Sequence, residues 1–226
     1  QLNRLSERLP DGDGQPEDAA HRASYGFPPE RVCAPVTRDQ AARPARFRGG
    51  SGIGQGCALR LASEGWHVVL VGRNAEKLAA TQALIAGQGG SAECFPSDVR
   101  DWDRMGELGA LVAETGLDLL INSAGGQFAA LAKDLSRGGW KAVVETNLDG
   151  AFFLSRQLYP ALAKRKGAVV HVVANLWQRG AATMAHSAAA RAGVVNLTQT
   201  LAIEWAGEGI RVNTILPGIF STPLMN

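Results

Sequence analysis

The sequence has few of the residues that define several large classes of protein. Its 226 residues include only three cysteines, Cys33, Cys57 and Cys94, an odd number without the spacing of metal ligands. They argue against a disulfide framework and favour reduced thiols in a cytoplasmic location. No apolar run approaches the roughly 20 residues of a membrane helix, so we expect a soluble chain with no membrane partner. A formal net charge of +2 offers no basic field for nucleic acid.

From residue 49 onward, short apolar runs alternate with helical patterns. The helical patterns carry apolar residues at three- and four-residue spacing, and two of them are long, at 138–163 and 187–207. Strands that are apolar throughout indicate a parallel sheet buried on both faces. The sequence therefore predicts an α/β fold, a Rossmann-type doubly wound sheet with helices on both faces. The expected strands are 66–72, 91–96, 117–122, 168–174 and 210–216.

The first strand of such a sheet is hard to find in this sequence. Residues 1–48 contain six of the ten prolines and no lysine, which predicts disorder or a segment unrelated to the domain at 49–226. Within them, DQAARPARFR (39–48) is too polar for a buried central strand. RVCAPVT (31–37) is a better candidate, although Pro35 would interrupt it. We therefore expect a first strand that is atypical or missing.

Glycines and an arginine indicate a dinucleotide site at the carboxyl ends of the strands. RGGSGIGQG (48–56) would let a helix N-terminus approach a pyrophosphate, although Cys57 stands where the third glycine of the dinucleotide motif is expected. About 20 residues downstream, VGRN (71–74) has no acid for a ribose 2′-hydroxyl. Arg73 instead suits a 2′-phosphate, which favours NADP over NAD. The alternative is a solvated arginine at a strand end.

Several ordered motifs together resemble the short-chain dehydrogenase/reductase family over residues 49–226. They are GGSGIG, the Asp98-Val99 pair, INSAG, ETNLDG and IRVNTILPGIFST. Within the family the chain is more similar to the peroxisomal trans-2-enoyl-CoA reductases than to the 2,4-dienoyl-CoA reductases, through AGGQF (124–128), GGWKAVVETNLDGAF (138–152) and HSAAARAGVVNLTQTLAIEW (186–205). This likeness implies a homotetramer. It also implies a cofactor site formed by Gly50, Ser51, Gly52, Ile53, Gly54, Arg73, Asp98, Val99, Asn122, Ala124, Gly125, Pro217, Gly218, Ile219 and Thr222.

The family's catalytic tyrosine and lysine are missing from their helix. Their positions are Ser187 and Arg191, which lie four residues apart and so share one helix face. Neither passes a proton as tyrosine does, but both can stabilise negative charge. This chemistry suits hydride addition from NADPH to an α,β-unsaturated acyl thioester, in which charge develops on the thioester oxygen. In the structural alternative, Ser187 begins the helix and Arg191 is a solvated charge.

Two further residues are weaker candidates for the same site. The resemblance implies that Asn147 holds a water there, whereas a mid-helix asparagine can instead bond to the backbone. His186 is a candidate proton donor to the α-carbon, or else a capped surface residue. Trp177 and Gln178 would line an acyl pocket.

Two other functions remain open. The chain ends soon after Pro217-Gly218, where family members continue, so it is either an active reductase or an inactive relic that binds nucleotide or associates through its long helices. A carbonyl or alcohol oxidoreductase would need a tyrosine near Ser187. The only tyrosines are Tyr25 and Tyr159, and Tyr159 lies well along the preceding helix.

Overall fold

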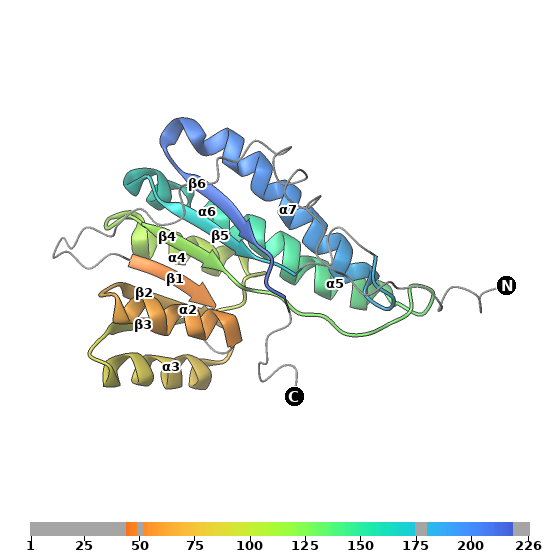
Figure 1. Cartoon of the computed structure of the whole chain (residues 1–226), viewed down its shortest axis with the longest axis horizontal. Coiled ribbons are helices and arrows are strands. Elements are labelled where there is room, and N and C mark those ends of the chain that lie inside the picture. The colour runs from red at the N-terminus through yellow and green to blue at the C-terminus, as the bar shows by residue number, and fades with distance from the viewer. Residues whose placement is uncertain (1–43, 49–51, 175–179, 219–226) are drawn as a thin grey trace, which may run out of the picture. The chain divides into compact units, whose positions relative to one another are not determined.

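The computed structural model describes residues 44–48, 52–174 and 180–218, which all fall within one compact unit of the chain. Six parallel strands form one sheet in the order β3-β2-β1-β4-β5-β6 (Figure 1). Five of them coincide closely with the apolar runs of the sequence, which confirms the predicted fold class. The strands are β1 Pro44–Arg48, β2 His67–Gly72, β3 Ser91–Pro96, β4 Leu119–Asn122, β5 Ala168–Val172 and β6 Arg211–Ile215.

Helices connect successive strands, and side chains cap several of them. Asn74, Asp101 and Ser136 each accept a hydrogen bond from a backbone N–H in the first turn of the helix that follows. The α-helices are α2 Gly52–Ser63, α3 Ala75–Gly87, α4 Trp102–Ala113, α5 Arg137–Val144, α6 Gly150–Arg165 and α7 Ala185–Trp205.

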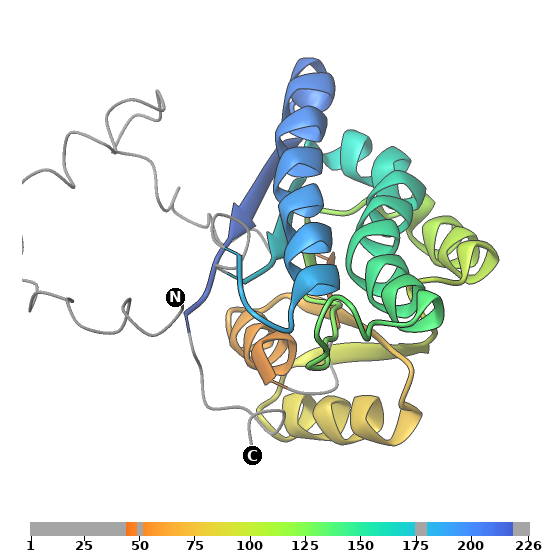
Figure 2. The ribbon, with the colours of Figure 1, turned by 90° about the vertical axis from the view of Figure 1, so that its right-hand side faces the viewer.

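Helices cover both faces of the sheet (Figures 1 and 2). Each face carries its own apolar cluster. On one face, α2 and α3 pack against alternate residues of β2, among them Val68 and Leu70. On the other face, α4, α6 and α7 bury a larger cluster that includes Val69 and Val71 of the same strand. Because successive side chains of a strand point to opposite faces, an uninterrupted apolar run fits a strand buried on both sides.

The expectation that residues 39–48 contain no strand is wrong. Residues 44–48 form β1, which pairs in parallel with β2 from Pro44↔His67 to Arg48↔Val71 and with β4 on its other side. The ladder joins main-chain groups, so a polar sequence can complete it when both neighbouring strands are strong. Pro44 is the first residue of the strand, a position where proline is tolerated in a sheet. The first strand is therefore atypical in sequence but present.

The long helix expected at 138–163 is interrupted by one wider turn. Between α5 and α6, residues Glu145–Asp149 form a π-helical turn, η1, in which the N–H of Gly150 donates to the carbonyl of Glu145. Single π turns add a residue to a helix and often occur at functional sites. This turn carries Asn147.

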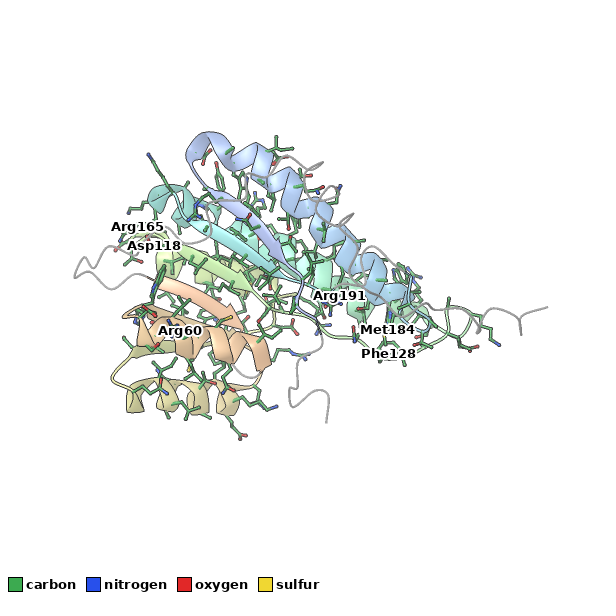
Figure 3. All side chains as sticks on the ribbon, in the orientation of Figure 1. Arg60, Asp118, Phe128, Arg165, Met184 and Arg191 are labelled. Carbon is green, nitrogen blue, oxygen red and sulfur yellow. The ribbon has the colours of Figure 1, made fainter. Side chains whose placement is uncertain are left out.

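The parallel strands bring the ends of several motifs to one edge of the sheet. Arg191 and Phe128 lie toward this end, whereas Asp118 and Arg165 lie at the opposite end (Figure 3). Near that opposite end, Arg165 donates from Nε to the carbonyl of Thr115 at 2.8 Å. In the part of the chain that the structure describes, no helix combines the length and the apolar character required to cross a membrane.

Candidate active site

Ser187 and Arg191 contact each other on the first two turns of α7. Arg191 Nε donates a hydrogen bond of 3.1 Å to Ser187 Oγ, and that hydroxyl donates one of 3.0 Å to Oε1 of Gln127. Ser187 is fully buried, and the helix begins two residues earlier, at Ala185. Both structural alternatives for this pair are therefore wrong, because Ser187 does not begin the helix and Arg191 is not fully solvated.

The guanidinium of Arg191 is a partly buried positive charge. Burial lowers its pKa from the usual value. Within the described residues it forms no ion pair with a carboxylate. A buried charge without a counter-ion is costly, and a bound anion or a developing negative charge would offset that cost. The site is thus electrostatically suited to an oxyanion.

The loop after β4 is held against the start of α7. The N–H of Ala130 donates to the carbonyl of Thr183 at 3.0 Å. Thr183 itself has a φ of 65°, a left-handed conformation that is uncommon for a β-branched residue and tends to occur at functional sites. This contact places Gln127 beside Ser187.

Asn147 joins the π turn to the same loop. Its Oδ1 accepts from the N–H of Gly126 at 2.8 Å and its Nδ2 donates to the carbonyl of Gly126 at 2.9 Å. A β-carbon at Gly125 would lie 2.8 Å from Asn147 Oδ1 and 3.8 Å from an Nη atom of Arg191, so only glycine allows this close approach. Asn147 thus bonds to backbone, as its structural alternative predicts, and together with Arg191 it also lines a small pocket.

His186 is fully buried rather than a capped surface residue. Its ring lies edge-on to Phe128, with 4.6 Å between the ring centroids and an angle of 83° between the planes. Neither ring nitrogen has a hydrogen-bond partner among the described residues. It neighbours Ser187 in sequence, but no hydrogen bond joins its ring to the Ser187–Arg191 pair in the described part of the chain.

At the cofactor end, a buried pair supports the loop after β4. Asn122 Oδ1 accepts from the N–H of Ala124 at 3.0 Å, and Asn122 Nδ2 lies 3.4 Å from Nδ1 of His171 on β5. The asparagine amide is a donor, so His171 Nδ1 acts as the acceptor and the ring is neutral. Burial lowers the pKa of His171 to about 4, which agrees with that assignment.

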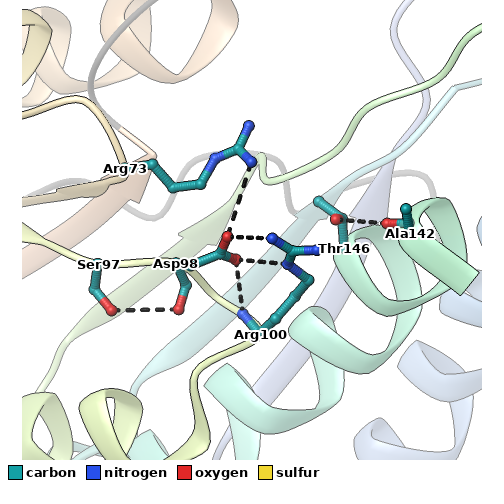
Figure 4. A network of polar contacts seen from close by, with 6 residues as sticks. All are labelled: Arg73, Ser97, Asp98, Arg100, Ala142 and Thr146. Carbon is teal, nitrogen blue, oxygen red and sulfur yellow. Dashed lines mark hydrogen bonds and ion pairs between the residues drawn. The ribbon is translucent and has the colours of Figure 1, made fainter.

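Arg73 and Asp98 meet beside the carboxyl ends of β2 and β3 (Figure 4). The Asp98 carboxylate accepts two side-chain hydrogen bonds and one backbone hydrogen bond from Arg100, whereas Arg73 Nη1 approaches it only to 3.8 Å. The hydrogen bonds from Arg100 are the main reason that the pKa of Asp98 is lowered. Val99 is buried, and a β-carbon at Gly150 would lie 2.7 Å from Val99 Cγ2.

The remaining predicted cofactor residues divide between described and undescribed positions. Gly52, Ile53 and Gly54 open α2, and Gly52 has a φ of 59° that favours glycine. Pro217 and Gly218 follow the end of β6. Gly50, Ser51, Ile219 and Thr222, together with Trp177 and Gln178, lie outside the described residues.

The described residues fit a dinucleotide. The first turn of α2 offers backbone N–H groups without helical partners, which suits a pyrophosphate. Gly52, Asn122 and Pro217 mark the same edge of the sheet, and the exposed guanidinium of Arg73 is available to a phosphate. These residues would hold a nicotinamide dinucleotide.

Sequence reasoning did not identify Gln127, Phe128, His171 or Arg100 as site residues. His171 lies within an apolar run that predicts a strand, and Arg100 follows the Asp98-Val99 pair without belonging to a motif. Gln127 and Phe128 belong to AGGQF, a stretch that contributes to the family likeness. That likeness was the one available signal for them.

Comparison with known proteins identifies the family of the chain. The family model described as short chain dehydrogenase matches residues 48–226. The chain is 42% identical to the probable 2,4-dienoyl-CoA reductase of Bacillus subtilis, over 75% of this chain and 69% of that protein. It is 37% identical to the peroxisomal 2,4-dienoyl-CoA reductase of Mus musculus, over 76% of this chain and 61% of that protein. It therefore spans about two thirds of the length of these relatives.

Solved structures agree in fold. A variant of actinorhodin polyketide ketoreductase with NADPH aligns with a TM-score of 0.77 at 33% identity, covering 81% of this chain and 72% of that one. The citronellol catabolism dehydrogenase of Pseudomonas aeruginosa PAO1 aligns with a TM-score of 0.74 at 39% identity, covering 78% and 74%. The chain therefore belongs to the short-chain dehydrogenase/reductase family of nicotinamide-dependent oxidoreductases.

Proposed function

We propose that this protein is an NADPH-dependent reductase of α,β-unsaturated acyl thioesters. The observation that carries the proposal is the Arg191 guanidinium, which is partly buried, hydrogen-bonded to Ser187 and without a carboxylate partner in the described part of the chain. Two relatives named as 2,4-dienoyl-CoA reductases are consistent with such a substrate.

The residues of this chain act on the charge of the reaction. NADPH, when bound, supplies a hydride to the β-carbon. The electron pair of the C=C bond then shifts toward the thioester oxygen, and Arg191 stabilises the negative charge there through N–H groups not used by Ser187. Ser187 holds the guanidinium in place and, if it turns away from Gln127, donates a second hydrogen bond to the oxygen. The α-carbon then takes a proton from water or from His186.

The proposed positioning residues act indirectly. Asn147 bonds both polar groups of Gly126, so it fixes the loop that carries Gln127. Its place in the same small pocket as Arg191 suits a bound water. Arg73 is proposed to bind the 2′-phosphate of NADP, since a guanidinium fork matches a phosphate and VGRN (71–74), at the end of β2, has no acid to bind the 2′-hydroxyl of NAD.

A carbonyl reductase is less well supported. A ketone alkoxide needs a proton at the oxygen itself, and neither serine nor guanidinium supplies one readily at neutral pH. Tyr159, the tyrosine within the described residues, donates its hydroxyl to Glu208 and packs on Trp205, near the far end of α7. Tyr159 lies on α6, and Trp205, on which it packs, is at the opposite end of α7 from Ser187. The tetramer and the cytoplasmic location remain predictions.

The proposal is tested by NADPH oxidation with three thioesters. We expect turnover of crotonyl-CoA or of hexa-2,4-dienoyl-CoA, measured as the loss of absorbance at the nicotinamide band of NADPH. We expect little turnover of acetoacetyl-CoA, which offers a ketone. Turnover of acetoacetyl-CoA alone would favour the carbonyl reductase and overturn the proposal. Binding of NADPH without turnover of any of them would favour the inactive relic.

A further inference from the structure

The Asp98 carboxylate lies between two guanidinium groups that it holds very differently (Figure 4). Arg100 binds it closely, with Nη2 2.7 Å from Oδ2 and Nε 3.1 Å from Oδ1. Arg73 Nη1 lies 3.8 Å from the same Oδ2, too far for a hydrogen bond. The side chain of Arg73 is also 61% exposed, compared with 38% for Arg100. Arg100 is thus the main partner of Asp98, and Arg73 is only loosely attracted.

A carboxylate at this position is unfavourable for a phosphate on Arg73. Any anion bound by Arg73 comes close to Asp98, because the two side chains are already within ion-pair distance. Asp98 also borders a surface pocket with three other acids, Asp101, Glu145 and Asp149. Arg100 is the one cation among the described residues that line this pocket. Without it, four acids and no cation among the described residues would line this pocket, and one of them, Asp98, lies beside Arg73.

The charge of Arg100 is engaged by these acids. Its pKa is raised, first by the hydrogen bond to Asp98 and by the Asp98 charge, and also by Glu145. This agrees with the geometry, in which the guanidinium of Arg100 bonds to Asp98 and lines the same pocket as Glu145. Arg100 is therefore less suited to bind a phosphate itself than to cancel the negative charge beside one.

We infer that Arg100 is a specificity-determining residue that keeps Arg73 available for the 2′-phosphate by neutralising Asp98. The inference rests on the proposed use of NADPH. When Arg100 occupies the carboxylate, Asp98 neither captures Arg73 nor repels the phosphate. NADH has no 2′-phosphate, so its binding does not depend on this balance. Arg100 thus sets the preference between the two cofactors without a contact to either.

The test compares the binding of NADPH and NADH to the whole chain by nicotinamide fluorescence. Arg100→Gln removes the charge and the hydrogen-bonding fork. We expect it to weaken NADPH binding by roughly fivefold, the upper range for an exposed ion pair, and to leave NADH binding unchanged. The NADPH deficit should shrink at high salt, because mobile ions screen exposed charges.

Three further variants separate this role from a structural one. Arg60→Gln removes the same charge from α2, where Arg60 forms an exposed pair with Glu64, and should not alter the ratio of the two dissociation constants. Arg100→Lys keeps the charge and should recover most of the NADPH preference. Asp98→Asn combined with Arg100→Gln removes the unpaired carboxylate and should restore the ratio, even if both cofactors bind more weakly because Asp98 is itself a predicted cofactor residue.

The outcomes distinguish this inference from the proposed function. If the wild-type chain binds neither dinucleotide, the proposed function fails and the inference fails with it. If the wild type prefers NADPH but Arg100→Gln weakens both cofactors equally, or leaves their ratio unchanged, the proposed function stands and the inference is overturned. A selective loss of NADPH binding that the double variant reverses would support it.

Discussion

The two ends of the proposed site hold their arginines in opposite ways. Arg73 and Arg100 lie at the surface, share a carboxylate and are reached by water. Arg191 lies partly buried beside a fully buried serine, with no carboxylate partner in the described part of the chain. Exposed ion pairs contribute little energy each and are screened by salt, whereas a charge of low solvent exposure acts strongly on its neighbours.

This contrast matches the function proposed for each end of the site, which is cofactor preference at Arg73 and Arg100 and charge stabilisation at Arg191. Cofactor preference needs a modest difference in binding free energy between two similar molecules, and balanced surface charges can supply it. Stabilisation of a transition state needs a large and directed field, which requires a fixed charge with little water around it. Changes near Arg191 should therefore have larger effects than changes near Arg73.

The largest effect is expected for Arg191→Met, which keeps the length of the side chain but removes the charge. Turnover of the unsaturated thioester should fall about 100- to 1,000-fold, as it does when a group that stabilises an oxyanion is lost. The NADPH dissociation constant should change much less than turnover, because the hydrogen bond that holds Arg191 within the described residues is to Ser187 on α7. Steady-state kinetics and fluorescence titration measure the two. A loss of binding equal to the loss of turnover would contradict the contrast.

The next largest effect is expected on the pH dependence of stability, through the buried His171. His171 is neutral in the fold with a pKa of about 4, below its usual value of 6.5, so the unfolded chain binds the proton more readily. The contribution of the neutral His171 to the free energy of unfolding is complete above about pH 6.5 and is lost as the pH falls toward 4. The loss amounts to at most about 3 kcal/mol of unfolding free energy.

His171→Asn tests this expectation because asparagine can still accept a hydrogen bond from Asn122 but does not titrate. Urea unfolding at pH 7, 5.5 and 4 should give a smaller loss of stability on acidification for the variant than for the wild type. Equal losses in the two proteins would show that His171 is not the group responsible.

A smaller effect is expected for Ser187→Ala. The serine hydroxyl is bonded to Gln127 and is acceptor to Arg191, so its removal loosens the guanidinium without removing the charge. We expect a decrease of about tenfold in kcat, the equivalent of one net hydrogen bond. Ser187→Thr keeps a hydroxyl and serves as the matched control. A loss as large as that of Arg191→Met would mean that the hydroxyl, and not the charge, is the principal stabilising group.

The sequence predicted those parts of the molecule that depend on local spacing. Ser187 and Arg191 are four residues apart on one helix, so their contact follows from helical periodicity alone. Five strands likewise carry their own apolar runs. β1 does not, because its pairing is supplied by β2 and β4, which are remote in sequence. No window around Pro44–Arg48 contains that information.

Contacts between distant segments were beyond sequence reasoning for the same reason. Gln127 reaches Ser187 across 60 positions, through a loop that the Ala130–Thr183 contact fixes. The π turn at Glu145–Asp149 was not anticipated either, since the apolar spacing of the helix runs through it without a break. Only the family likeness pointed to these segments, and it could not give their geometry.

The smallest effect is expected for Tyr159→Phe, and it tests whether the contrast describes the right part of the molecule. The hydroxyl of Tyr159 is bonded to Glu208, and its ring lies on Trp205, 5.0 Å between centroids. Both partners are at the end of α7 opposite Ser187, so kcat and KM for the thioester should be unchanged. A large decrease in kcat would mean that a tyrosine takes part in the reaction after all. The oxyanion chemistry assigned to Arg191 would then have to give way to a carbonyl reduction that uses a phenolic proton.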